Sequence, residues 1–433
     1  MEKMDVVIKG KCFVDGQLAQ RCIGVKDGRI VAVRADLDGE RVFDYGHKLV
    51  LPAAIDAHVH MRDPGATHKE DFGTGSLSAL HGGVTCILDM PNSDPPTTTA
   101  AALREKASIA ASKSLVDFGL FAGITPGCDV ELLSSSGAVG FKLYMAGTTG
   151  NLQVSSLEAV REELEAVAAS GKALAVHAED EGLRIKGAES SLGDHLRNRP
   201  NECETSAIRK LGESGVGGLR THICHVSAKE SLPLLEGMPN ITSEVTPHHL
   251  LLDMDSKLEG FGKVNPPLRR RGDRQALFNA LKEGTLDIIA SDHAPHTTEE
   301  KEEDFDFAPS GIPGVETLAP LMLQLVRDKH IPLSRFVSGV CERPADIFGL
   351  NKGRLELQRD ADIMVVDMMD STEIRADRLH SKCAWTPYER LSGIFPKAVF
   401  LRGKIMMEDG TQVGERAGRE VVEREKSRGI AGD

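Results

Sequence analysis

The chain has 433 residues, of which 40% are hydrophobic, 27% are charged and only 4% are aromatic. This composition is that of a globular protein with an aliphatic core, and the length suits one large domain or two domains. The net charge of −13 argues against nucleic acid as a partner, because phosphate binding requires a basic surface.

No targeting or membrane segment can be recognised in the sequence. The N-terminus lacks the basic start and apolar core of a signal peptide, and no apolar run approaches the ~18 residues of a membrane span. The eight cysteines form no Cys-x-x-Cys motif, and a chain of this size needs no disulfides to fold. We therefore expect reduced thiols, a cytoplasmic location and no association with membranes.

The two ends of the chain share a β-rich texture. Residues 1–50 hold short strand-like runs separated by Gly and Asp, and the same texture returns after Gly349. Strand-like runs in the second segment are Arg354–Leu357, Ala361–Val366 and Ala398–Arg402. We expect residues 1–50 and 351–413 to form one small β-sandwich domain. Residues 414–433 are charged and lack an apolar period, which is typical of an exposed tail.

Between these ends, residues 51–350 alternate apolar runs with stretches of helical period. The eight runs are Leu51–His60, Val84–Pro91, Asp117–Ile124, Ala138–Met145, Ala173–Glu179, Leu219–Val226, Ile241–His249 and Leu286–His293. Eight βα units predict an α/β protein with a (β/α)8 TIM-type barrel. A doubly wound open sheet is the alternative, and the lack of a glycine-rich dinucleotide loop makes it less favoured.

Polar residues end almost all of these runs, which is where barrel enzymes carry their catalytic groups. They include His58 and His60, Asp89 and Asn92, Lys142, His177 and Glu179, Cys224 and His225, Glu244 and His248, and Asp292 and His296. Residues two apart on a strand point to one side, so His58 and His60 direct two imidazoles to one point. Buried ionisable groups are rare unless they are paired or bind a metal.

The residue types indicate a metal centre. Histidines from three strand ends, together with Asp292, exceed the three protein ligands of one catalytic zinc. The surplus predicts two metals that share a hydroxide. Lys142 lies where a bridging anion is wanted, and a buried lysine that loses its proton can react with CO₂ to give a carbamate. The alternative is that Lys142 pairs with a carboxylate.

Other residues near these strand ends have more than one interpretation. Arg62 follows His60 and suits a substrate carboxylate, which a guanidinium binds in a bidentate manner. Cys224 could reach the metals, but it also suits a small core position. Glu244 and His248 suit support for the metal ligands. Tyr144–Leu152 has the glycines of a segment that closes over a substrate.

The strand-one motif Asp56-x-His58-x-His60-x-Arg62-x-Pro64-Gly65 resembles the signature of the dihydroorotases, in the amidohydrolase superfamily. Further matching motifs are Met90-Pro91-Asn92, Phe141-Lys142-Leu143-Tyr144, Val176-His177-Ala178-Glu179, Cys224-His225-Val226, Val264-Asn265-Pro266-Pro267, Ser291-Asp292-His293-Ala294-Pro295-His296 and Ala308-Pro309-Ser310-Gly311. The resemblance covers almost the whole chain. The motif around Lys142 is similar to the branch that uses a carboxylated lysine.

The resemblance implies two Zn²⁺ per subunit, bridged by N6-carboxylysine at Lys142 and by hydroxide. One zinc would be held by His58, His60, Lys142 and Asp292, and the other by Lys142, His177 and His225. Asp292 would also be the general acid and base, which requires it to be near both water and substrate.

The same resemblance implies the substrate and its contacts. Arg62, Asn92 and His296 would bind the substrate carboxylate. The ring amide would be bound by Asn265 and the backbone of Pro309, Ser310 and Gly311. The reaction would be the reversible cyclisation of N-carbamoyl-L-aspartate to L-dihydroorotate and water in pyrimidine biosynthesis. Relatives also imply a homodimer or an association with aspartate carbamoyltransferase.

Two other readings remain open at this point. Allantoinases and dihydropyrimidinases share the fold, the metals and the lysine, but their uncharged rings would leave the Arg62 guanidinium without a charge to neutralise. A non-catalytic scaffold for aspartate carbamoyltransferase is the second alternative. Such relatives have lost metal ligands, whereas every implied ligand is present here.

Overall fold

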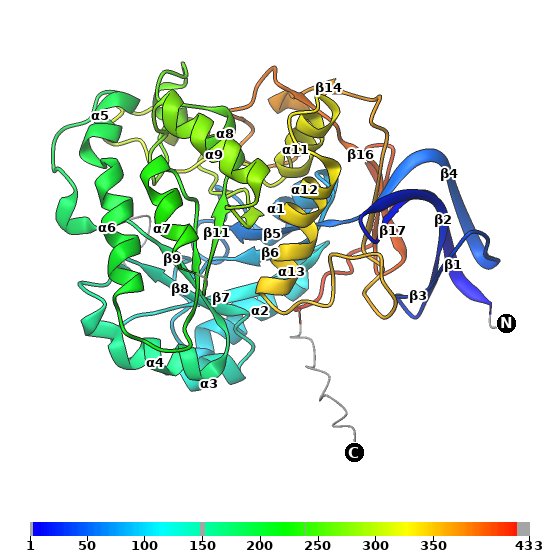
Figure 1. The fold of residues 1–433 in the computed structure, drawn as a ribbon, viewed down its shortest axis with the longest axis horizontal. Helices are drawn as coiled ribbons and strands as arrows, with labels where there is room; N and C mark the ends of the chain where they lie inside the picture. Colours follow the sequence, from blue (N-terminus) through cyan, green and yellow to red (C-terminus); the bar gives the residue numbers. More distant parts are fainter. Residues whose placement is uncertain (1–2, 148–151, 239, 422–433) are drawn as a thin grey trace.

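The computed structural model describes residues 3–147, 152–238 and 240–421. Within these residues the strands form two eight-stranded sheets and one two-stranded sheet. Figure 1 shows the parallel sheet with helices outside it, and the second sheet, built from the blue and the orange-to-red ends of the chain, beside it.

The first sheet is a parallel barrel whose strands are neighbours in chain order. Its strands are β5 (Ala54–Val59), β6 (Val84–Asp89), β7 (Asp117–Gly123), β8 (Gly140–Tyr144), β9 (Ala173–His177), β10 (Arg220–Ile223), β11 (Ile241–Val245) and β12 (Ile288–Ile289). A parallel bridge from Val59 to His293 joins the first strand to the segment after the last one and closes the ring. Each predicted run contains one strand, and the predicted barrel is confirmed.

Helices cover the outside of the barrel, so its strands are buried on both faces, as in parallel sheets generally. The α-helices are α1 (Phe72–His81), α2 (Ala100–Lys113), α3 (Val130–Ser135), α4 (Arg161–Ser170), α5 (Leu192–Asn198), α6 (Asn201–Gly212), α7 (Leu232–Glu236), α8 (Pro247–Leu251), α9 (Arg271–Glu283), α10 (Thr298–Lys301), α11 (Leu318–Arg327), α12 (Leu333–Val337) and α13 (Arg343–Ile347). A π-helical turn, Ser338–Glu342, joins the last two. Short 3₁₀ turns are η1 (Glu158–Val160), η2 (Glu181–Leu183), η3 (Lys229–Ser231), η4 (Glu259–Gly262) and η6 (Ala376–Arg378).

Both chain ends build the second sheet, in the order β18-β17-β16-β13-β4-β1-β2-β3. Its strands are β1 (Met4–Val14), β2 (Gln17–Lys26), β3 (Arg29–Arg34), β4 (Gly39–Pro52), β13 (Ile363–Val366), β16 (Pro396–Leu401), β17 (Lys404–Glu408) and β18 (Thr411–Gln412). The sheet curves over its own apolar face, because Phe43 of β4 packs edge-on against Phe400 of β16, two strands away, with ring centroids 5.2 Å apart. The two-stranded sheet pairs β14 (Thr372–Glu373) with β15 (Ser392–Gly393).

Two local expectations differ from the structure. Residues 354–357 form no strand, because the preceding Gly353 (φ +82°) turns the chain tightly against the carbonyl of Cys341. Residues 418–421 do not hang free as part of an exposed tail. They pair with the start of β7, where Phe118 N–H donates to the Arg419 carbonyl (2.9 Å) and Val421 N–H donates to the Phe118 carbonyl (2.8 Å). Backbone groups of β7 that no neighbouring strand uses explain this contact.

The eight cysteines are all free. No helix in the described ranges combines the length and the apolar character that crossing a membrane requires.

Candidate active site

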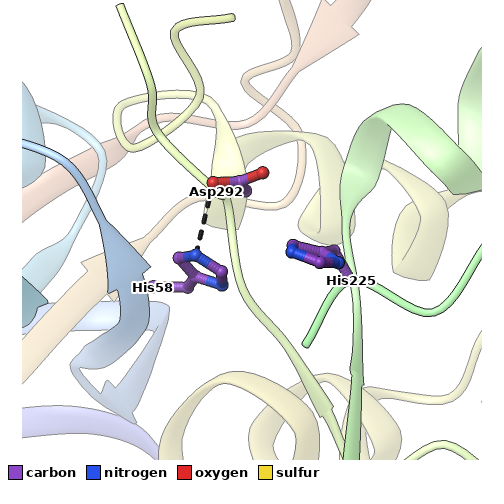
Figure 2. A group of neighbouring side chains, drawn as sticks. All are labelled: His58, His225 and Asp292. Carbon is purple, nitrogen blue, oxygen red and sulfur yellow. Dashed lines mark ion pairs between the residues drawn. The ribbon is translucent and has the colours of Figure 1, made fainter. Parts of the chain in front are cut away.

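The carboxyl ends of the barrel strands bring the predicted metal ligands together. His58 lies on β5, Lys142 on β8 and His177 at the end of β9, while His225 and Asp292 follow β10 and β12. Figure 2 shows His58, His225 and Asp292 directed toward one another from three separate segments. Their ligand atoms all lie within 4.8 Å of one another, which is a spacing that one metal ion can span.

His58 and His60 are oriented by acceptors behind them. Nδ1 of His58 lies 2.5 Å from Oε1 of Glu244, and Nδ1 of His60 lies 2.6 Å from the amide oxygen of Asn92. The Nε2 atoms of the two rings lie 3.4 Å and 3.1 Å from Oδ1 of Asp292. Metal-binding histidines in proteins have this arrangement, in which one nitrogen donates to an oxygen and the other faces the metal.

His177 and His225 form the second half of the cluster. Nδ1 of His177 lies 3.1 Å from Nε2 of His225, and Nε2 of His177 donates to Glu179 at 2.8 Å. Glu179 is held in turn by Arg199. Burial lowers the pKa of both histidines, so both rings are neutral near pH 7 and have lone pairs for a metal. Nδ1 of His225 has no hydrogen-bond partner in the described part of the chain.

Lys142 is 1% exposed, and its Nζ donates to Sγ of Cys224 at 3.0 Å. No carboxylate among the described residues forms an ion pair with it, so the alternative of a Lys142–carboxylate pair finds no partner there. A buried ammonium surrounded by imidazoles would be costly. A carbamate at this position would remove that cost and supply an anion between the two halves of the cluster.

The electrostatics of the cluster also fit a bound cation. Burial disfavours a charged His58, but the neighbouring Glu244 and Asp292 raise its pKa to about 10. Burial alone would raise the pKa of Asp292, yet His58 and His60 hold it well below the usual range. The carboxylates therefore demand positive charge at this point, which a metal would supply in place of a proton.

Three residues of the site have a strained backbone. Arg62 (φ +59°), His225 (φ +38°) and Asp292 (φ +48°) all adopt the left-handed conformation that side chains rarely occupy. Such residues cost free energy and occur where the surrounding structure must aim a functional group.

Arg62 is 7% exposed and lies beside the histidine cluster. Its Nε donates to the Pro295 carbonyl at 3.1 Å, and its Nη2 lies 3.1 Å from Nε2 of His296. No ion pair with a carboxylate involves Arg62 among the residues described. Burial lowers the pKa of His296, so the ring is neutral. Lys69 donates to its Nδ1 at 3.1 Å, and its Nε2 lies 3.1 Å from the Ser310 carbonyl.

The cavity above the cluster contains most of the predicted substrate contacts. It is lined by His58, His60, Arg62, Asn92, Lys142, Tyr144, His177, His225, Asn265, Asp292, Ala294, Ser310 and Gly311. The structure does not bring Pro309 into this lining, because its carbonyl turns toward the buried Lys301 at 2.7 Å. His296 lies behind the lining. Residues 148–151 of the segment expected to close over substrate lie outside the described residues.

Sequence reasoning missed most of the groups that support these side chains. His195 holds Oδ1 of Asn265 through Nε2 at 3.0 Å, and His222 donates to Glu244 at 3.1 Å. Glu244 supports His58 as expected, but His248 has no hydrogen-bond partner in the described residues. His222 could have been found from the sequence. It lies on β10 two residues before Cys224, so the alternation of the strand places both side chains on the same face.

Comparison with known proteins identifies the class. The chain matches the Amidohydrolase family over residues 49–406, and it belongs to that family. The clustered histidines and carboxylates agree with the metal dependence of such enzymes.

Within that family, several similar curated proteins are named dihydroorotase. The dihydroorotase of Methanosarcina acetivorans is 40% identical over 94% of this chain and 92% of the relative. The dihydroorotase of Halobacterium salinarum is 40% identical over 96% and 99%. Among solved structures, the L-hydantoinase (dihydropyrimidinase) of Arthrobacter aurescens has a TM-score of 0.91 at 29% identity, covering 96% of this chain and 99% of its own. The dihydropyrimidinase of Brevibacillus agri has a TM-score of 0.87 at 25% identity, covering 96% and 98%.

Proposed function

We propose that this protein is a dihydroorotase, which interconverts N-carbamoyl-L-aspartate and L-dihydroorotate with the release or uptake of water. The observation that carries the proposal is the buried Arg62 guanidinium, which opens onto the histidine cluster and has no carboxylate partner among the described residues. A buried cation of this kind requires an anion, and a substrate carboxylate provides one. The curated relatives, which are named dihydroorotases, agree with this assignment.

The metal centre is part of the proposal. His58, His60, Asp292 and carboxylated Lys142 would hold one zinc, and Lys142, His177 and His225 would hold the other. Two zinc ions there would activate water and polarise the ring carbonyl. Two observations support this set. Lys142 is buried with no carboxylate partner among the described residues, and Glu244, Asn92 and Glu179 orient imidazole nitrogens toward the centre.

The chain's own groups would bind the substrate and move its proton. Arg62 would hold the substrate carboxylate, which fixes the ring above the cluster. Asp292 is ionised and lies at the floor of the cavity. It would accept a proton from water and deliver it to the ring nitrogen that leaves when the amide bond breaks. The reverse transfer serves cyclisation. Asn265 and the Ser310 backbone, on the same wall, would pair with the ring amide.

A second candidate function is supported by the likeness to hydantoinases and dihydropyrimidinases of known structure. Those names refer to uncharged cyclic amides or ureides. Arg62 separates the two candidates, because an uncharged ring would leave the guanidinium buried without an anion.

The test is a substrate comparison with the zinc-loaded protein. We expect turnover of dihydroorotate and none of dihydrouracil, hydantoin or allantoin. In Arg62→Met, kcat/KM for dihydroorotate should fall by roughly 10²–10³-fold, because a buried charge-assisted contact is lost. Lys69→Met is the matched control, because this neighbouring cation is already paired with Glu300 at 2.8 Å. Its effect should be about tenfold or less. Turnover of the uncharged rings in preference to dihydroorotate would overturn the proposal.

A further inference from the structure

Lys301, the last residue of α10, is a buried cation that the proposed chemistry does not use. It is 1% exposed. Its Nζ donates to three backbone carbonyls, those of Pro309 (2.7 Å), Gly311 (3.0 Å) and Lys263 (3.3 Å). Its ammonium lies 5.7 Å from the ring centroid of Trp385. No carboxylate within the described ranges forms an ion pair with it, so backbone carbonyls are the acceptors of its hydrogen bonds.

These three carbonyls belong to the two segments that form one wall of the active site. Gly311 N–H donates to the Lys263 carbonyl at 2.9 Å, so Lys301 lies where the two segments meet. Lys263 is two residues before Asn265, and Ser310 and Gly311 line the cavity. One ammonium group therefore ties both halves of this wall together from behind.

The backbone of this wall has two faces. The carbonyls of Pro309 and Gly311 turn away from the cavity toward Lys301, whereas the Ser310 carbonyl between them faces Nε2 of His296 at 3.1 Å. The N–H and C=O of a trans peptide point in opposite directions, so a Pro309 carbonyl held away from the cavity directs the N–H of Ser310 to the substrate side. Gly311 has φ +142°, and a Cβ there would lie 2.4 Å from the Ala294 carbonyl, so the segment has no room to shift inward.

We propose that Lys301 is the positioning residue for the substrate's ring amide, acting through the Pro309–Gly311 backbone. The inference rests on the proposed function, since it concerns the wall expected to read the ring. A lysine suits this task because its three donors match three carbonyls and its length reaches them from α10. Without it, the carbonyls of Pro309 and Gly311 would be free to turn toward water, and the Ser310 peptide would no longer hold one orientation.

The test is the variant Lys301→Met, which keeps the length of the side chain and removes all three donors. We expect KM for dihydroorotate to rise about tenfold or more while kcat falls less than about threefold, because the metal ligands and Asp292 are untouched. Zinc content should stay at the wild-type value. Trp385 is the only tryptophan, and its Nε1 donates to the His296 carbonyl at 2.8 Å, so its fluorescence reports whether this region stays folded.

Arg335→Met is the matched control. Arg335 is a half-buried cation that also donates to backbone carbonyls, those of Leu286 and Asp287, but it acts at the far end of β12 from the cavity. It should lower stability and leave KM within about twofold of wild type. If Lys301→Met lowers only stability, as Arg335→Met does, the inference is wrong. If Lys301→Met fails to fold, Lys301→Gln, which keeps two donors, must still raise KM. Wild type that does not turn over dihydroorotate would instead refute the proposed function.

Discussion

Two buried cations at the carboxyl end of the barrel contrast with one buried cation at its amino end. At the carboxyl end, Lys142 and Arg62 are buried with no ion-pair partner among the described residues. At the amino end, Lys352 is also buried, but it lies 2.7 Å from Asp117, 2.7 Å from Asp362 and 3.2 Å from Asp360. Burial opposes its charge, yet these carboxylates hold the pKa of Lys352 well above its usual range.

The contrast separates function from stability. A buried charge without a partner is costly, so its retention indicates that something absent from the polypeptide completes it. A buried charge with several partners needs no ligand. At the amino end such charges join β7 to the second sheet, because Asp117 pairs with both Lys352 and Arg402. Barrels of this type place catalysis at the carboxyl end and stability at the amino end. Variants at the two ends should therefore fail in different assays.

The largest expected effect is that of Lys142→Ala. If a carbamate at this lysine holds the metals, the variant should lose metal and kcat/KM should fall by ~10⁴-fold or more, because both halves of the centre lose a ligand. Metal content by mass spectrometry and turnover of dihydroorotate are the measurements. The wild type, exposed to ¹³C-labelled bicarbonate, should show a carbamate carbon by NMR that the variant lacks. Full metal content and activity in Lys142→Ala would refute the role of this residue.

Glu179→Gln should weaken the same centre less. Glu179 accepts from Nε2 of His177 and from Arg199, and it does not face the cavity. Losing the charge behind a metal-binding histidine typically costs 10–100-fold, so we expect metal affinity to fall by about that factor. Competition with a chelator measures it. Glu181→Gln is the control, since Glu181 accepts from Arg184 and from the Gly147 N–H, whereas His177 donates to Glu179. Equal losses in both variants would contradict the assignment.

The sequence was most informative about the side chains that end the strands. His58, His177 and Asp292 follow apolar runs, so their convergence could be predicted from the barrel alone. Glu244 was also expected behind them, but Arg199 was not, because it reaches Glu179 only after the helices fold onto the barrel. Contacts between a side chain and distant backbone carbonyls could not be predicted either.

Lys301 shows what the sequence pattern cannot predict. It lies in the acidic run of residues 299–304, and nothing in that run indicates that its side chain turns inward toward three backbone carbonyls. The amino-end cluster was missed for a related reason. Asp117 and Lys352 are 235 residues apart in the numbering and come together only when the second sheet docks. The local sequence pattern predicts the strands and the residues at their ends. Contacts between residues far apart in the sequence cannot be predicted from that pattern.

At the amino end, Lys352→Met should destabilise the fold without harming catalysis. Removing the cation leaves three carboxylates facing one another, which costs about 3–5 kcal/mol of the free energy of unfolding. Denaturant unfolding measures this loss, and kcat/KM of the folded variant should stay within about twofold of wild type. A large loss of kcat/KM with unchanged stability would erase the distinction between the two ends.

The pH dependence of this variant sharpens the test. Burial already raises the pKa of Asp362 in the wild type, even with Lys352 beside it. Without Lys352 the folded-state pKa of Asp362 rises further above its unfolded value, because Lys352 is the cation that lowers it. Groups shifted in that direction favour the fold at low pH and lose that contribution as pH rises through the folded pKa. The stability deficit of Lys352→Met should therefore shrink as the pH is lowered from 7 toward 5.

The smallest effect is expected from ending the chain after Ala417. This removes the segment Gly418–Val421, whose Arg419 carbonyl and Val421 N–H pair with Phe118 and whose Arg419 N–H donates to Asp117 at 2.9 Å. Two backbone–backbone hydrogen bonds and one from the backbone to the Asp117 carboxylate, at ~0.5–1.5 kcal/mol each, predict a loss of about 2–4 kcal/mol, with unchanged kcat and KM. A chain ended after Val421 keeps all of these contacts and is the control. If both truncations melt alike, the segment does not clamp β7, and the paired charges alone stabilise the amino end.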